Sequence, residues 1–294
     1  MRKLPPLVLL ACLLAPAPAQ AWGADAHHAI MERAIALLPA EIRPLFEKRR
    51  AEVVERVLDP DTWRTAGFEV EDPNHFLDID VPAYGPYPFA ALPRDYDAAV
   101  LTFGIQTVRR NGLLPWRTAE MYGNLRRAFE AYRTPTASGQ QAIVHFSAWM
   151  AHYGSDAHQP LHGVANYNGQ LTGQVGVHAR FETTLFERYR SRLRIAPKAI
   201  PPVRNPRDFI FDAVLEDATL APILLKADLD AIGTRDVYDN AYYDTLFSSV
   251  GGMMERRLNE SIAAVAALIA GAWEAAGSPA VPVELPVELE RRRR

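Results

Sequence analysis

Apolar residues recur every three or four positions along most of this 294-residue chain, which is the spacing of one face of an α-helix. The stripe formed by Ile143, Phe146, Trp149, Met150 and Tyr153 shows the pattern clearly. No segment shows the strict alternation of apolar and polar residues that is typical of a half-buried strand. The sequence therefore predicts an all-α protein.

The pattern breaks into eight expected helices, over residues 26–38, 40–58, 96–110, 116–132, 138–157, 178–194, 207–231 and 239–276. The last of these contains Gly251 and Gly252, which mark a candidate kink. Three loops lie between the helices, at residues 59–94, 163–177 and 195–206, and they are rich in Asp, Pro, Tyr, Gly and Asn. No internal repeat or change in composition divides residues 22–277, so we expect one helical domain. Residues 278–294 contain three prolines and end in four arginines, which predicts a flexible tail.

The N-terminal segment has the features of a secretory signal peptide. Two basic residues precede a short apolar run from Leu4 to Leu14, and Ala19-Gln20-Ala21 is a small-x-small cleavage site. We therefore expect residues 1–21 to be removed, leaving Trp22 as the first residue of a secreted or periplasmic protein. The alternative is a lipoprotein signal with Cys12 as the lipidated residue, although little apolar sequence precedes it. The apolar run is too short to span a bilayer.

The amino-acid composition excludes several classes of protein. Apolar residues make up 49% and charged residues 23% of the chain, as in an ordinary globular protein. The formal charge of −3 provides no overall basic field that would attract nucleic acid or anionic lipid. Cys12 is the only cysteine, which excludes a disulfide scaffold and a cysteine-ligated zinc finger.

The eight histidines carry the strongest chemical pattern. His152 and Asp156 are four residues apart, as are His178 and Glu182, so each pair can point from one helix face. His162 lies between the two pairs, just after Pro160. Imidazole and carboxylate at this spacing, with no thiolate, suit a catalytic zinc site. A surface hydrogen bond explains either pair alone, but two pairs joined by another histidine favour metal binding.

These motifs resemble the superfamily of zinc-dependent phospholipases C and S1/P1 nucleases, all-α enzymes with three zinc ions. The resemblance runs from Trp22 to about Tyr189, with a looser match in the final helix. The family's hallmark is an N-terminal tryptophan whose amino group and carbonyl bind zinc. Cleavage before Trp22 would create that residue.

The resemblance implies nine metal ligands: Trp22, His27, Asp61, His75, His152, Asp156, His162, His178 and Glu182. Trp22 and His27 would hold one zinc, and Asp61, His75 and His152 a second. Asp156 would bridge these two zincs, and the last three ligands would hold the third. His28 remains an alternative to His27, and Asp59 an alternative to Asp61.

The resemblance also implies a reaction. A water between two zincs would attack the phosphorus of a phosphodiester, with Asp61 orienting the water as a general base. Phe76, Asp78 and Tyr167 are the candidate substrate-binding residues. Asp78 is also a candidate for orienting His75, whereas we expect His145 and His158 to have supporting or packing roles. Tyr84, Tyr87 and Phe89 either contact substrate or pack the loop.

Some features of the sequence resemble the phospholipases C of this superfamily, and others resemble its nucleases. Glu182 as the third acid, the interval from His162 to His178 and the pair Asn166-Tyr167 resemble phospholipase C. The spacing from Trp22 to His27, and Arg64 three residues after Asp61, resemble the nucleases. Negative charge argues against a long nucleic-acid footprint. We therefore expect a phospholipase C-like hydrolase acting on a phospholipid head group, with an S1/P1-type nuclease acting on single strands as the alternative. A non-catalytic zinc-containing binding module is less consistent with a complete ligand set. The sequence indicates no protein partner.

Overall fold

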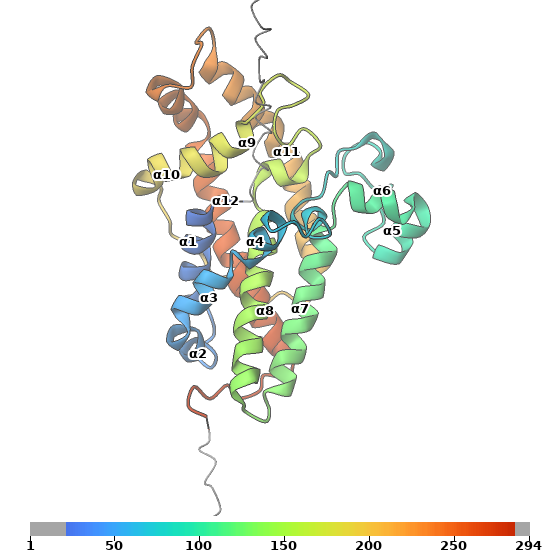
Figure 1. The fold of residues 1–294 in the computed structure, drawn as a ribbon, viewed down its shortest axis with the longest axis vertical. Coiled ribbons are helices and arrows are strands. Elements are labelled where there is room, and N and C mark those ends of the chain that lie inside the picture. The colour runs from blue at the N-terminus through green and yellow to red at the C-terminus, as the bar shows by residue number, and fades with distance from the viewer. Residues whose placement is uncertain (1–21, 286–294) are drawn as a thin grey trace, which may run out of the picture.

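The computed structural model describes residues 22–285 and is all-helical, with no strand in that range (Figure 1). The predicted all-α class is therefore confirmed. The predicted signal peptide, the Cys12 alternative and residues 286–294 of the predicted tail lie outside the described residues. Within residues 22–285, no helix has the length and apolar character needed to cross a bilayer.

A bundle of long helices forms the core. Helices α7 (Leu114–Ala131) and α8 (Ala137–Asp156) form an antiparallel hairpin, and α12 (Asn240–Ala275) runs along both (Figure 1). Helix α11 (Pro206–Ile232) packs against α7 and α12. Every residue of α12 from Ser261 to Trp273 is buried, because this stretch is almost wholly apolar and has neighbours on all sides.

Side-chain caps explain where three of these helices begin. Thr136 accepts a hydrogen bond from the Gly139 amide at the start of α8, at 3.0 Å. Asp239 accepts one from the Tyr242 amide at the start of α12, at 2.8 Å. Asn205 caps α11 in the same way, and Pro206 occupies its first turn. Each cap satisfies an amide that has no partner within its own helix.

The N-terminal helices differ from the prediction. Helix α1 (Ala24–Ile35) forms as expected, but residues 40–58 do not form one helix. They contain α2 (Arg43–Lys48) and α3 (Arg50–Arg56), because the backbone at Arg49 leaves the helical region. The predicted loop 59–94 is also partly helical, with α4 (Asp59–Thr65), η1 (Asp72–His75) and η2 (Pro82–Tyr84).

Two further predicted helices are interrupted. The segment 96–110 divides into α5 (Tyr96–Phe103) and α6 (Ile105–Arg110) at Gly104, whose φ of +79° favours glycine. These two helices project from the side of the bundle (Figure 1). The segment 178–194 forms α9 (Val177–Ala179), a π-helical turn η4 (Arg180–Leu185), α10 (Phe186–Tyr189) and η5 (Arg190–Arg192). The predicted loops 163–177 and 195–206 are confirmed as largely irregular, apart from the ends of flanking helices and 3-10 turns.

The first residues of the predicted flexible tail, 278–285, are packed against the rest of the protein. The Tyr132 hydroxyl donates to the carbonyl of Pro282 at 2.9 Å, and the Gln140 amide donates to the carbonyl of Val283 at 3.0 Å. Val281 is buried. Residues 278–285 are therefore held against the α7–α8 hairpin rather than free.

Candidate metal centre

Buried histidines and carboxylates form three groups whose ligand atoms lie within 4.8 Å of one another. The groups are His27, His152 and Asp156; Asp61, His75 and His152; and His162, His178 and Glu182. Their members come from α1, α4, η1, α8, η3 and the α9–η4 segment. The structure thus brings together eight of the nine ligands that the family resemblance implies.

The first two groups share His152, and Asp156 of the first group, the last residue of α8, also lies beside the second group. Asp156 Oδ2 lies 3.1 Å from His75 Nδ1 and 3.4 Å from His152 Nε2. Its Oδ1 lies 3.3 Å from His27 Nε2. Each carboxylate oxygen therefore faces a different group, which is the arrangement that a bridging ligand requires.

The second group is completed by Asp61, the third residue of α4. Asp61 Oδ1 lies 3.9 Å from His75 Nδ1 and 4.0 Å from His152 Nε2, while these two ring nitrogens are 3.0 Å apart. Zinc bonds of about 2.0–2.1 Å in a tetrahedron place ligand atoms about 3.3–3.4 Å apart. The observed separations bracket this value.

The third group depends on the π-helical turn. His178 Nε2 lies 2.8 Å from Glu182 Oε2 and 3.1 Å from His162 Nε2. The sequence predicts that His178 and Glu182 share a face through regular helical spacing. The structure brings them together through a wider turn, and such π turns often occur at functional sites.

Main-chain carbonyls orient three of the imidazoles. The Nδ1 atom of His152 donates to Val57 at 2.8 Å, that of His178 donates to Tyr167 at 3.0 Å, and that of His162 donates to His75. A proton on Nδ1 leaves the Nε2 lone pair free to face the group. This is the usual support for a metal-binding histidine.

Several ligand atoms are buried without a hydrogen-bond partner in the described part of the chain. They include both ring nitrogens of His27 and one carboxylate oxygen each of Asp61, Asp156 and Glu182. Unpartnered buried polar atoms are costly, and cations bound in these groups would satisfy those atoms that face them. The donor set of imidazole nitrogens and carboxylate oxygens therefore fits zinc.

Burial sets the protonation of the ligands. It lowers the pKa of His152 to about 3 and holds the pKa of His27 and His75 well below the ordinary value. These imidazoles stay neutral, which is the form that binds metal. Burial raises the pKa of Asp156, and the nearby Asp61 carboxylate raises it further. A cation in the centre would reverse that effect by stabilising the charged carboxylates.

A cavity of about 330 Å³ opens beside the second and third groups. Its lining includes three members of the groups, His75, His162 and His178. The predicted substrate-binding residues Phe76, Asp78 and Tyr167 also line it, together with Arg64, Asp72, Arg110 and Leu161. Burial and the neighbouring Asp80 raise the pKa of Asp78 to about 7. The second and third groups and the predicted substrate-binding residues therefore share one cavity.

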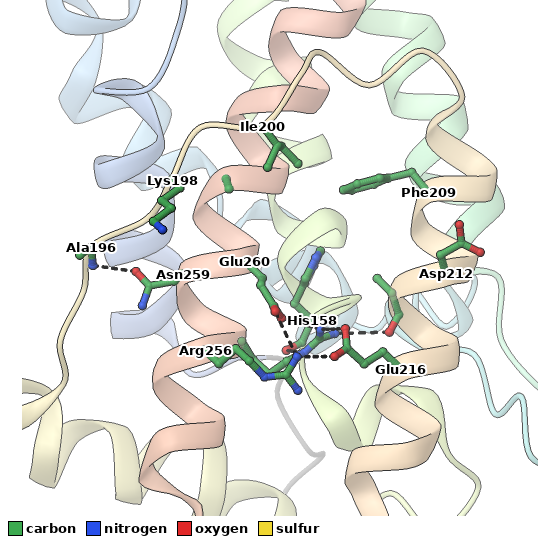
Figure 2. Close-up of a pocket in the computed structure, with 13 residues that line it drawn as sticks. His158, Ala196, Lys198, Ile200, Phe209, Asp212, Glu216, Arg256, Asn259 and Glu260 are labelled. Atoms are coloured by element: carbon green, nitrogen blue, oxygen red, sulfur yellow. Dashed lines mark hydrogen bonds and ion pairs between the residues drawn. The ribbon is translucent and has the colours of Figure 1, made fainter.

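Figure 2 shows a second, larger cavity of about 660 Å³ between α11, α12 and residues 196–200. The charged side chains on its floor pair with one another: Arg256 contacts Glu260 at 3.1 Å and also contacts Glu216. No member of the three groups lines this cavity. The smaller cavity is therefore the candidate active site.

The structure distinguishes between the alternatives left open by the sequence. His27 and Asp61 belong to the groups, whereas His28 and Asp59 do not. Asp59 instead accepts a hydrogen bond from Trp149 Nε1 at 2.9 Å. Trp22 is fully buried, with its ring 5.9 Å from that of Phe181, the residue before Glu182. Metal binding by its main chain stays a prediction.

Two other histidines have supporting places. His145 lies 3.3 Å from Glu52 of α3 and is outside the groups. His158 Nδ1 donates to the Gly154 carbonyl at 2.8 Å, and its ring lies at the floor of the larger cavity (Figure 2). Among the loop aromatics, Tyr84 is buried, and neither Tyr87 nor Phe89 lines the smaller cavity. Tyr84 and Phe89 therefore pack in the loop, whereas Tyr87 is 59% exposed.

The structure does not show Asp78 orienting His75, and another carboxylate, that of Glu71, lies near the ring nitrogen of His75 that faces away from the group, although outside hydrogen-bond distance. His75 faces its group through Nδ1, and its Nε2 lies 3.8 Å from Glu71 Oε1, on the preceding turn. Glu71 also accepts a hydrogen bond from Tyr153 and lies 3.5 Å from Arg117. Asp78 makes no hydrogen bond to His75, and its Oδ1 is buried without a partner. The spacing of four between Glu71 and His75 is the sequence feature that could have indicated their proximity.

Gln159 and two arginines were also missed as site residues. Gln159 Nε2 donates to Glu182 Oε2 at 2.8 Å, and its Oε1 accepts from the Leu161 amide at 2.6 Å. Arg64 is largely buried, and its Nη2 lies 3.1 Å from Asp61 Oδ1. Arg110 ends α6 and lines the cavity. Only tertiary packing brings Arg110 to the centre, so its position in the sequence gave no indication.

Comparison with models of known protein families found no match, and a search of curated proteins found no significant relative.

Proposed function

We propose that this protein is a zinc-dependent phosphodiester hydrolase of phospholipase C-like substrate class. The observation that carries the proposal is that the second and third buried groups contribute side chains to one cavity that is also lined by two arginines. Metal-ligand clusters and arginines in a shared cleft suit substrates with a phosphoryl group.

Zinc bound by these residues would act as a Lewis acid toward the phosphoryl group and would make water a usable nucleophile near neutral pH. The protein's own side chains would bind and orient the substrate. Arg64 and Arg110 would hold phosphoryl oxygens through charge-assisted hydrogen bonds. Asp61, which lies between His75 and Arg64, would orient the attacking water.

Exposed apolar side chains in the chain segments that line the cavity favour a phospholipid substrate. Phe68 and Val70 are 59% and 65% exposed, and they lie between the cavity residues Arg64 and Asp72. Leu171 and Val175 are 72% and 59% exposed in the loop between the cavity residues Tyr167 and His178. Exposed apolar groups in the segments that form a cavity are suited to contact with a lipid surface.

A nuclease is the second candidate, and a different observation favours it. The rings of Phe76 and Tyr167 and the carboxyl group of Asp78 line the same cavity. Aromatic rings can stack on a nucleobase, and a carboxyl group can hydrogen-bond its edge. The same three residues would contact a nucleotide in place of a lipid head group.

The test uses zinc-loaded protein that begins at Trp22. It is offered phosphatidylcholine vesicles and single-stranded DNA side by side, with bis-nitrophenyl phosphate as a general phosphodiester. Faster turnover of the phospholipid supports the proposal, and faster turnover of DNA supports the nuclease. Hydrolysis of none of the three would contradict the enzyme proposal and favour a binding module.

Two histidine variants provide the matched comparison. His162→Ala removes a member of the third group and should abolish turnover. His145→Ala removes a partly buried histidine of α8 that lies outside the groups, and it should keep wild-type turnover. Equal rates in the two variants would show that turnover does not arise at this centre.

A further inference from the structure

Helix α11 buries two aspartates that face the rest of the bundle. Asp217 and Asp228 are each 0% exposed, and eleven residues separate them, which is about three helical turns. Each aspartate pairs with an arginine from another segment, Arg257 for Asp217 and Arg180 for Asp228. The two arginines connect to different parts of the candidate metal centre.

Arg257 of α12 ties the first ion pair to the end of α8. It is 1% exposed and contacts Asp217 Oδ1 at 2.7 Å. It also donates to the carbonyl of Ala157 at 3.3 Å and to that of His158 at 3.2 Å. These carbonyls directly follow Asp156. The last carbonyls of a helix have no hydrogen-bond donor within that helix. Arg257 is therefore the donor for the carbonyls at the end of α8, next to the Asp156 carboxylate.

Glu216 and Glu260 complete the surroundings of Arg257. Each accepts a hydrogen bond from its Nη1 at 2.8 Å, and these carboxylates form part of the cavity floor in Figure 2. Gly163, which follows the ligand His162, lies close to α11, because a Cβ there would stand 2.9 Å from the Asp217 side chain. The network therefore holds both the end of α8 and the turn after it against α11.

Arg180 ties the second ion pair to the third metal group. It lies between the ligands His178 and Glu182, and its guanidinium group contacts Asp228 Oδ1 at 2.9 Å. It also donates to the carbonyls of Gln174 at 3.0 Å and Val175 at 2.9 Å. Tyr242 of α12 donates to Asp228 as well. These contacts fix the π-helical turn and the loop before it against α11 and α12.

Stability alone does not account for two such pairs. Burying two charges costs desolvation energy, and well-packed apolar residues in their place are often as stabilising or more so. Arg257, however, bonds to main-chain groups next to Asp156, and Arg180 itself lies two residues from each of His178 and Glu182. Such contacts behind the ligands commonly hold a metal site in its binding geometry.

We propose that the two ion pairs are separate positioning devices for the metal centre. Arg257 and Asp217 position Asp156 and so support the two groups that it lies between. Arg180 and Asp228 position His178 and Glu182 and so support the third group. This inference rests on the proposed metal binding of the centre, but it does not require that the centre hydrolyse any particular substrate.

The experiment measures zinc stoichiometry and affinity by competition titration in the wild type, Arg257→Met and Arg180→Met. Methionine keeps much of the apolar stem and removes the guanidinium fork. Loss of a supporting contact typically weakens metal binding about 10–100-fold. We expect Arg257→Met to bind one zinc as tightly as the wild type and two zincs more weakly. We expect Arg180→Met to bind two zincs as tightly as the wild type and one more weakly. Arg126→Met, which breaks the exposed Arg126–Glu130 pair of α7, should keep all three.

Lysine variants and the melting temperature of the zinc-free proteins separate positioning from general destabilisation. Arg257→Lys and Arg180→Lys keep the charge and should restore only part of the affinity, because lysine cannot make the forked contacts. The proposal is overturned if both methionine variants bind all three zincs more weakly by the same factor. It is also overturned if they lower the melting temperature and leave every zinc affinity unchanged. If either methionine variant fails to fold, its lysine counterpart decides in the same way. A wild type that binds no zinc would refute the metal centre itself, whereas three zincs without hydrolysis would refute only the enzyme proposal.

Discussion

Replacing Asp156 by asparagine should change stability in opposite directions with and without zinc. In the zinc-free protein, Asp156 is a fully buried carboxylate with Asp61 nearby, and its Oδ1 has no hydrogen-bond partner among the described residues. The charge therefore opposes folding until a cation is bound. Asparagine keeps the shape of the side chain and removes the charge.

The magnitudes follow from the contacts. Relief of a buried unsatisfied group is worth about 1–3 kcal/mol, so the zinc-free Asp156→Asn protein should be more stable than the zinc-free wild type by about that amount. In a chain of this size each kcal/mol raises the melting temperature by about 2–4 °C. With zinc, the variant loses the carboxylate whose two oxygens lie beside His27 of the first group and His75 of the second. Each 100-fold loss of affinity at saturating zinc removes about 2.7 kcal/mol of stabilisation.

The assay is thermal unfolding with a chelator and with excess zinc, alongside zinc content. Asp156→Asn should melt above the wild type in chelator and below it in zinc, and it should lose two zincs. Glu182→Gln should lose one. Asp59→Asn, a neighbouring acid outside the groups, should keep the wild-type response to zinc. A variant that melts below the wild type in chelator, or that keeps all its zinc, would refute the reasoning about burial and bridging.

Three side chains at the cavity and behind His75 can each be tested by one substitution. Arg110→Ala should raise KM for a phosphodiester about 10-fold, whereas Arg109→Ala, outside the cavity lining, should leave KM unchanged; steady-state kinetics decides. The pKa of Asp78, about 7, lies above its unfolded value, so this group's stabilising contribution is lost as pH rises from about 4 through 7. Asp78→Asn should therefore be more stable than the wild type at pH 8, by about 1–2 kcal/mol in denaturant unfolding, and equal stability would contradict this. Glu71→Gln should weaken one zinc about 10-fold in competition titration, and unchanged affinity would show that Glu71 does not support His75.

Local spacing predicted the parts of the site that lie close together in sequence. The intervals of four in His152–Asp156 and His178–Glu182 predicted that each pair would lie together, although a π-helical turn rather than a regular helix joins the second pair. His27 and Asp61 lie beside His152 because of the way α1 and α4 pack on α8. The periodicity of the sequence cannot predict that packing. Those two assignments came from the family resemblance.

The errors also have physical causes. The helix predicted over 96–110 is broken by Gly104, a residue whose positive φ is visible in the sequence only as a glycine within an apolar stripe. Arg257 and Arg180 were missed because their partners lie on α11, far away along the chain. A buried arginine in an amphipathic helix has the same local pattern as an exposed one, so only the fold distinguishes them.

Crystals of the zinc-loaded protein, measured for anomalous scattering at the zinc edge, test the central claim most directly. Three peaks per chain are expected: between His27 and Asp156, among Asp61, His75 and His152, and among His162, His178 and Glu182. A single peak, no peak, or peaks away from these groups in zinc-replete protein would contradict the trinuclear centre.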